Sequence, residues 1–147
     1  MTGARPSPED ESIADAAFLL RTINPRWIIS DGAGGWRVAS GAFQDLTDPD
    51  GTTAMSVYVE EILTSTGRGA ANLIASRKGW AVVAITAEAV RAFGLSVVRV
   101  PIVDDPNGDA HAHVFGKKTG STQKRLVAAA ERRLWPDDAD PDVIDTI

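Results

Sequence analysis

The sequence contains no cysteine, which excludes disulfides, thiolate nucleophiles and cysteine-based metal sites. It has no apolar run approaching the roughly 20 residues of a membrane span. Its first residues also lack the hydrophobic region of a signal peptide. We therefore expect a cytoplasmic protein that does not enter a membrane.

Recognisable catalytic and cofactor motifs are missing too. The chain has no Gly-x-Ser-x-Gly, no His-Glu-x-x-His, no Gly-x-Gly-x-x-Gly and no Walker A sequence. No internal repeat is visible. These absences imply no cofactor, and they favour a non-enzymatic interaction protein as the first hypothesis.

Charge is distributed unevenly along the chain. The formal net charge is −5, yet residues 136–147 alone contain five Asp and no basic residue. Residues 1–11 are acidic as well, so the body between the two ends is slightly basic. An acidic total argues against nucleic-acid binding, whereas acidic ends on a slightly basic body leave that function open.

The body has the composition of one globular domain. A chain of 147 residues with 44% hydrophobic and 24% charged residues suits a single core. We predict a single α+β domain over residues 12–135, in which a mixed β-sheet packs against an N-terminal and a C-terminal helix. A flexible segment at 1–11 and a flexible acidic tail at 136–147 flank this domain.

Apolar residues at helical spacing predict the N-terminal helix. Ser7 and Pro8 suit its first turn. Apolar side chains then recur on one helical face as far as Ile23, and Asn24-Pro25 ends the helix.

Local patterns predict further elements in the middle of the chain. Short apolar runs at 26–29 and 35–38 flank a glycine-rich turn, which is typical of a hairpin. Residues 80–85 form the clearest strand, and Thr86 is a suitable N-cap for a short helix that reaches Phe93. The run 80–103 could place two strands parallel in one sheet.

Two apolar runs around an acidic turn make up residues 95–116. The Val- and Ile-rich run 96–103 predicts a buried strand that ends, or reaches a sheet edge, at Pro101. The turn at 104–109 combines Asp, Pro and Asn-Gly. A second strand follows directly after it.

That second strand, at 110–115, carries the two histidines of the chain. Since side chains alternate along a strand, Asp109, His111, His113 and Phe115 share one face. We expect the Ala and Val residues between them to face the core.

This histidine face admits three interpretations. Asp-x-His-x-His could chelate a metal, although three ligands in sequence make no site without a fourth group. His111 could instead be an acid/base residue near Asp104 and Asp105. Both histidines could also simply decorate a half-exposed strand, and no metal site is assigned.

A second candidate site follows the same strand. A turn with Gly and Lys at 116–120 leads into a helix that we predict to end near Trp135. A strand followed by a basic turn and a helix N-terminus is an arrangement that can bind an anion. Lys117, Lys118 and Ser121 are the candidate anion-binding residues; the alternative is a capped, solvated helix start.

The predicted C-terminal helix region is strongly basic. Residues 116–135 hold six basic side chains and one acid. Such a helix could contact nucleic acid or an acidic partner, or it could pair with the chain's own acidic tail. No aromatic residues alternate with these bases, which weakens binding to single strands.

Several segments together resemble a family of small uncharacterised bacterial proteins. The segments are Leu19-Leu20-Arg21-Thr22-Ile23-Asn24-Pro25-Arg26-Trp27, Ser40-Gly41-Ala42-Phe43, Met55-Ser56-Val57-Tyr58, Gly94-Leu95-Ser96-Val97-Val98, and His111-Ala112 with Gly116. The family pattern places Leu-Leu-Arg in the first helix, followed by Ser-x-Ala-Phe and a Pro-x-His-Ala strand.

The resemblance covers most of residues 18–130. Here Asn107-Gly108-Asp109 separates Pro106 from the His-Ala pair, and His113 matches no family feature. The resemblance therefore implies a shared fold unit and favours His111 alone over a two-histidine site, and it brings no activity.

Three hypotheses on function follow. The first is a small accessory protein that acts with a protein partner. The second is a small hydrolase or transferase, with His111 as acid/base, Asp104 or Asp105 orienting it, and Lys117 and Lys118 holding an anionic group. The third is nucleic-acid binding through the basic C-terminal helix.

Overall fold

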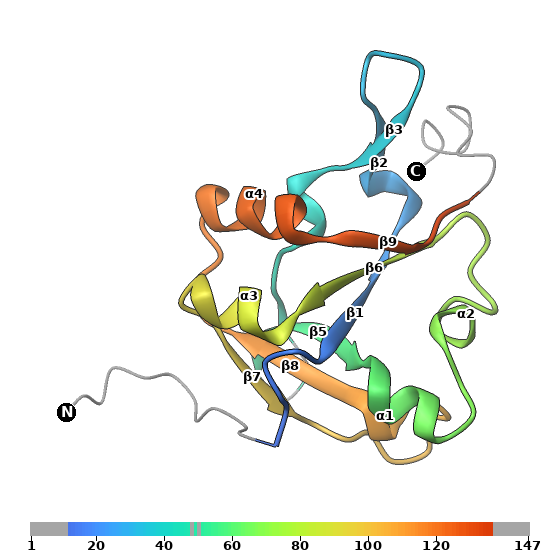
Figure 1. The fold of residues 1–147 in the computed structure, drawn as a ribbon, viewed down its shortest axis with the longest axis vertical. Helices are drawn as coiled ribbons and strands as arrows, with labels where there is room; N and C mark the ends of the chain where they lie inside the picture. Colours follow the sequence, from blue (N-terminus) through green and yellow to red (C-terminus); the bar gives the residue numbers. More distant parts are fainter. Residues whose placement is uncertain (1–11, 48, 50, 137–147) are drawn as a thin grey trace.

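The computed structural model describes residues 12–47, 49 and 51–136 (Figure 1). The predicted flexible segment at 1–11 and the acidic tail beyond Pro136 lie outside these residues. The strands are β1 (Phe18–Ile23), β2 (Ile28–Ser30), β3 (Trp36–Val38), β4 (Leu46–Thr47), β5 (Thr53–Val59), β6 (Ala81–Thr86), β7 (Ser96–Arg99), β8 (His111–Phe115) and β9 (Glu131–Leu134). The helices are α1 (Glu60–Ser65), α2 (Ala70–Leu73), α3 (Ala87–Ala92) and α4 (Gly120–Ala129), with 3₁₀ turns η1 (Pro25–Trp27), η2 (Ser40–Ala42) and η3 (Gly108–Ala110).

One central sheet confirms the predicted single α+β domain. Its strand order is β7-β8-β5-β1-β6-β9, with β4 paired to β5. Neighbouring strands are antiparallel at every described pair. Strands β6 and β7 run in the same direction, but three strands lie between them, so residues 80–103 form no parallel pair.

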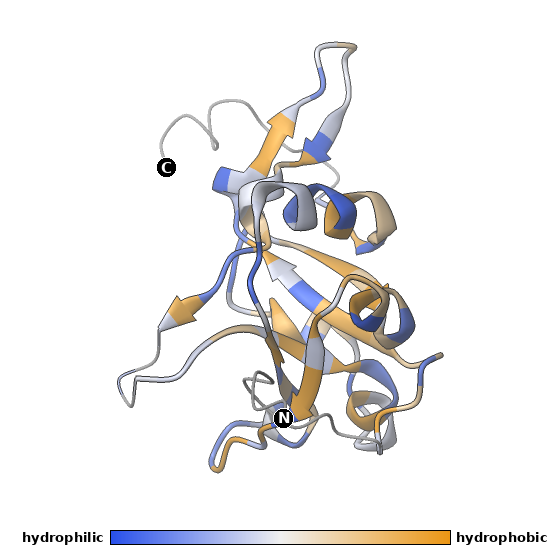
Figure 2. Cartoon of the chain, turned by 90° about the vertical axis from the view of Figure 1, so that its left-hand side faces the viewer, coloured by the Kyte–Doolittle hydropathy of each residue, from blue (hydrophilic) through white to orange (hydrophobic). Residues whose placement is uncertain are grey.

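The sheet separates two clusters of buried side chains. The larger cluster lies on the face covered by α3 and α4 and includes Val90 and Leu126. The smaller cluster lies on the opposite face, under α1 and α2, and includes Leu63 and Leu73. Figure 2 shows hydrophobic strands in the interior and hydrophilic segments in the surrounding helices and loops.

The predicted N-terminal helix is wrong over the described residues. Residues 12–17 are turns and Phe18–Ile23 is strand β1, in the middle of the sheet. Leu19 and Leu20 are both fully buried, one in each cluster. A strand buried on both faces is continuously apolar, so its residues matched the helical spacing by coincidence.

The predicted C-terminal helix is too long. Helix α4 ends at Ala129, and Glu131–Leu134 forms strand β9 on the edge of the sheet. The helix ends there because the residues of β9 hydrogen-bond to β6 along the edge of the sheet, and these bonds replace helical ones. The outer Arg132 and Arg133 are therefore strand residues.

Predictions based on turns and caps are confirmed. Strands β2 and β3 form the expected hairpin, which projects from the body in Figure 1. The Asp31 carboxylate accepts backbone N–H bonds from Ala33 and Gly35 in its turn, which lowers the pKa of Asp31. Thr86 caps α3 by accepting from the N–H of Ala89 at 3.2 Å.

Strand β8 is buried on both faces. His111 and His113 are each 5% exposed, whereas we expected a half-exposed histidine face. The Ala112 and Val114 side chains between them lie in the core as predicted. Among the described helices, none is long and apolar enough to cross a membrane.

Candidate functional site

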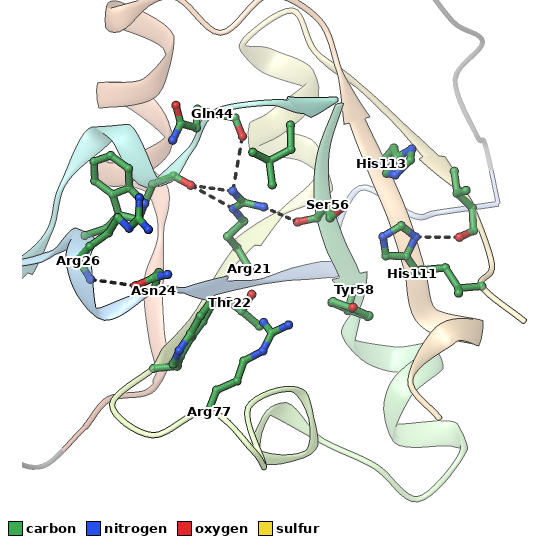
Figure 3. A pocket seen from close by; sticks show the side chains of 16 residues that line it. Arg21, Thr22, Asn24, Arg26, Gln44, Ser56, Tyr58, Arg77, His111 and His113 are labelled. Carbon is green, nitrogen blue, oxygen red and sulfur yellow. Dashed lines mark hydrogen bonds between the residues drawn. The ribbon is translucent and has the colours of Figure 1, made fainter. Parts of the chain in front are cut away.

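A pocket of about 610 Å³ lies on the face of the sheet that α1 and α2 cover only in part. Side chains from separate segments line it: Arg21, Thr22, Asn24, Arg26, Trp27, Ala42, Gln44, Leu46, Ser56, Tyr58, Arg77, Trp80, Val100, Ile102, His111 and His113. Figure 3 shows how these side chains converge. The volume falls within the usual range for small-molecule sites.

Strand register brings the floor of the pocket together. Tyr58 pairs with His111 and Ser56 pairs with His113 across β5 and β8. Paired residues point to the same side of an antiparallel sheet, so these four side chains share one face. Thr22 of β1 lies on that face as well, since Leu20 pairs with Tyr58.

Aromatic rings along this face of β5 and β8 form a continuous ladder that starts in the pocket and ends at Phe115. The ring centroids of Tyr58 and His111 are 5.4 Å apart, those of His111 and His113 are 4.9 Å apart, and those of His113 and Phe115 are 5.6 Å apart. Each pair is edge-to-face, which is a favourable geometry. His111, His113 and Phe115 therefore share one face as predicted, whereas Asp109 lies in η3, before the strand, and is exposed.

The His111 ring is oriented by a backbone carbonyl. Its Nδ1 lies 2.8 Å from the oxygen of Val100, in the loop after β7. A carbonyl can only accept, so Nδ1 carries a proton. In the neutral ring Nε2 then has the free lone pair, and this side of the ring points into the pocket (Figure 3).

The two acids predicted to orient His111 do not do so. Asp104 is exposed and has a φ of 69° in the turn. Asp105 accepts from the N–H of Asn107 at 2.8 Å. Both belong to a loop closed by its own backbone bonds, and the Val100 carbonyl takes the position at Nδ1 that we expected for a carboxylate.

Arg21 fills the point where β1 and β5 separate. The two strands pair at Leu19 and Leu20 but not beyond. The guanidinium of Arg21 then donates to the carbonyl oxygen of Ser56 at 2.9 Å and to that of Ala42 at 2.8 Å. It thereby satisfies carbonyls that no neighbouring strand reaches.

The charge of Arg21 persists in this position. Burial lowers the pKa of Arg21 to about 10, and the nearby Asp45 carboxylate opposes the shift. The guanidinium is therefore cationic at neutral pH. Arg21 gives the pocket a fixed positive charge, although its hydrogen bonds go to the protein.

Lys118, one of the predicted anion-binding residues, pairs with Asp45, the same carboxylate that lies near Arg21. Its side chain is 2% exposed, and Nζ lies 2.6 Å from Oδ1 of Asp45. Nζ also donates to the carbonyl oxygens of Val114 and Gly116. This geometry leaves Lys118 no open direction toward an external anion.

The other two predicted anion-binding residues are exposed. Lys117 lies in the turn before α4, and Ser121 lies in the first turn of that helix. Neither lines the pocket. The structure thus does not bring Lys117, Lys118 and Ser121 together as one site.

The electrostatics of the pocket instead come from arginines that sequence reasoning missed. Arg26 and Arg77 are exposed and line the pocket together with the half-buried Arg21. The guanidinium of Arg77 stacks over the Trp80 ring at 4.5 Å. Within the described residues, no Asp or Glu lines this pocket. The result is a cavity with a positive lining.

Tyr58 supplies a hydroxyl to the same cavity. Burial, followed by the negative charge of Asp105, raises the pKa of Tyr58, while Arg77 lowers it in part. The phenol is therefore protonated at neutral pH. It can donate a hydrogen bond to a bound anion.

Tyr58 is the single tyrosine of the chain, so its titration can be followed directly. We expect the absorbance change of tyrosinate formation to have its midpoint above the ordinary value of 10.0. The folded state then binds more protons than the unfolded state above that pH, so this group lowers stability as the pH rises through the window. An Asp105→Asn variant should bring the midpoint closer to 10.0; a wild-type midpoint at or below 10.0 would contradict the expected burial.

Two further hypotheses concerned a metal site on the histidine strand and a nucleic-acid surface on the basic C-terminal region. No group of three or more potential metal ligands occurs among the described residues, so Asp109, His111 and His113 do not form the metal site considered above. Of the six bases at 116–135, three have partners within the protein: Lys118 with Asp45, Arg133 with Glu60 and Glu131, and Arg132 with Trp135. A nucleic-acid surface over residues 116–135 would therefore have fewer free charges than predicted.

No family model, curated protein or solved structure matches this chain. The resemblance to small uncharacterised bacterial proteins stays a prediction. Its Leu-Leu-Arg segment lies on a strand and not on a helix. More than half of the pocket-lining residues nevertheless lie in the segments that carry it. Those segments were the signal that could have pointed to Arg21 and Tyr58.

Proposed function

We propose that the pocket binds a small anionic substrate and that His111 transfers a proton during its hydrolysis or group transfer. The observation that carries the proposal is the lining charge, which combines three arginines with no acid among the described residues. Guanidinium groups bind phosphates and carboxylates through paired hydrogen bonds. A cavity with this lining favours an anion over a neutral or cationic ligand.

His111 is suited to proton transfer in this position. With Nδ1 donating to Val100, Nε2 accepts the proton of an attacking water or hydroxyl group. The oxygen of that nucleophile bonds to the substrate as the leaving group departs, and the leaving group takes its proton from solvent. The protonated Tyr58 hydroxyl stabilises the charge that develops beside it.

Binding is tested with inorganic pyrophosphate as the probe, by titration calorimetry at low salt. We expect saturable binding to the wild type and about tenfold weaker binding to Arg77→Met, because one charge-assisted hydrogen bond contributes roughly 1.5–3 kcal/mol. Arg125→Met, on the exposed surface of α4, is the matched control and should bind like the wild type. Absence of saturable binding, or equal losses in both variants, would contradict the proposal.

The role of His111 is tested by His111→Gln, whose amide can still donate to Val100. We expect this variant to bind pyrophosphate as the wild type does and to lose hydrolysis of phosphate esters in a chromogenic screen. Undiminished hydrolysis would remove His111 from the mechanism. A loss of folding, followed by circular dichroism, would identify a structural histidine.

The accessory role is the second candidate, and exposed apolar side chains favour it. Leu46 is 67% exposed and Val103 is 84% exposed. Leu46 and Ile102, the neighbour of Val103, both line the pocket. A partner protein seated on these side chains would cover the pocket, and Leu46→Ser should then release any stoichiometric partner that co-purifies with the wild type.

A further inference from the structure

The two ends of the pocket differ in chemistry. One end contains Tyr58, His111 and His113, which come from β5 and β8. The other end contains Asn24 and Arg26, from the segment around η1, as Figure 3 shows. Arg21 and Arg77 lie between them in the same view. A ligand that spans the pocket would therefore meet a cationic centre and two distinct ends.

The η1 end holds an indole ring in a fixed position. The backbone N–H of Trp27 donates to the carbonyl oxygen of Asn24 at 2.9 Å, and the backbone carbonyl of Trp27 accepts from the N–H of Ala39 at 2.7 Å. The Trp27 ring also packs against Gly41, where an added Cβ would come within 2.6 Å of Cζ3. The Trp27 side chain is partly buried against the core as well, and the part that stays accessible lines the pocket.

Two amide side chains lie at this end as well. Oδ1 of Asn24 accepts from the backbone N–H of Arg26 at 3.1 Å, which leaves the Asn24 amide N–H groups as donors. Gln44 is exposed and brings both a donor and an acceptor. An aromatic surface with donors and an acceptor beside it matches a flat heterocycle that has polar edges.

We infer that the anionic substrate is a nucleoside phosphate, whose base stacks on Trp27 and whose phosphate lies at Arg77 beside Arg21. This inference rests on the proposed function and names its substrate class. The arginines account for the phosphate, whereas Trp27, Asn24 and Gln44 account for the base. A simple phosphate ester would use only the first of these two groups.

The inference is tested by calorimetry with five probes: ribose 5-phosphate and the 5′-monophosphates of adenosine, guanosine, cytidine and uridine. We expect at least one nucleotide to bind roughly tenfold or more tightly than ribose 5-phosphate, the gain typical of base stacking. Trp27→Leu, which keeps an apolar contact on Gly41 but has no ring face, should remove that difference. It should leave the affinity for ribose 5-phosphate unchanged.

Matched controls separate the outcomes. Trp36→Leu, on the hairpin outside the pocket, should keep the preference for the nucleotide. If ribose 5-phosphate binds as tightly as all four nucleotides, or if Trp27→Leu keeps the difference, the inference is wrong while the proposed anion site stands. If neither the nucleotides nor ribose 5-phosphate nor pyrophosphate binds, the proposed function and the inference both fail.

Discussion

Replacing Arg21 by Met should lower the free energy of unfolding by about 3–4 kcal/mol. The substitution leaves the carbonyls of Ala42 and Ser56 without the donor that satisfies them, and each buried unsatisfied group costs about 1–3 kcal/mol. In a domain of this size we expect a melting temperature about 10 °C lower. Denaturant unfolding followed by circular dichroism measures both effects.

Two further variants define the contribution of Arg21. Arg21→Lys retains the charge but not the forked geometry, so its stability should lie between those of the wild type and Arg21→Met. Arg125→Met alters an exposed arginine and should change stability by no more than about 0.5 kcal/mol. Equal stability of Arg21→Met and Arg125→Met would show that the buried guanidinium does not join β1 to β5.

Removing the carboxylate of Asp45 should be at least as costly. Asp45→Ala leaves the ammonium of Lys118 buried without its counter-charge. Breaking a buried ion pair from one side typically costs about 3–5 kcal/mol. The double variant Asp45→Ala/Lys118→Met removes both charges and should recover part of the loss, as a double-mutant cycle of unfolding free energies would measure.

The pH dependence of Asp45→Ala has a definite sign. Burial lowers the pKa of Lys118, and Asp45 opposes this shift in the wild type. Without Asp45 the pKa falls further, so the folded state binds fewer protons than the unfolded state below the ordinary lysine value of 10.5. Stability rises with pH in that window. The penalty of Asp45→Ala should therefore be largest near neutral pH and shrink toward pH 10.5; a constant penalty would mean that Lys118 is not the affected group.

These two predictions concern the framework behind the pocket. Arg21 reaches from β1 to η2, and Lys118 joins the turn before α4 to Asp45. Both contacts hold the segment from Ala42 to Leu46 against the sheet, and this segment lines one side of the pocket. Loss of either contact should therefore weaken pyrophosphate binding in addition to stability.

Local chemistry in the sequence was sufficient for several elements. Residues 26–38 were predicted as a hairpin from a glycine-rich turn between apolar runs, and Thr86 was predicted as a helix cap. The end of β7 before Pro101 follows from the missing N–H of proline. Each of these signals acts within a few residues, so no distant contact was needed to read it.

The candidate site was predicted only in part. His111 and its shared face with His113 follow from alternation along one strand. The Val100 carbonyl that orients His111 could not be predicted, because a backbone acceptor has no side-chain signature. The arginines of the pocket lie far apart in sequence, and nothing local distinguishes them from surface arginines.

By itself the sequence determined the fold class, the hairpin, the capped helix α3 and the histidine strand. The tertiary structure decided that Phe18–Ile23 is a central strand and that Arg21, Asp45 and Lys118 form one cluster of charges. The reason is physical: a strand buried on both faces has no period that separates it from a helix. Arg21, Asp45 and Lys118 are brought together only when distant segments pack against one another. No local sequence pattern acts over separations of this size.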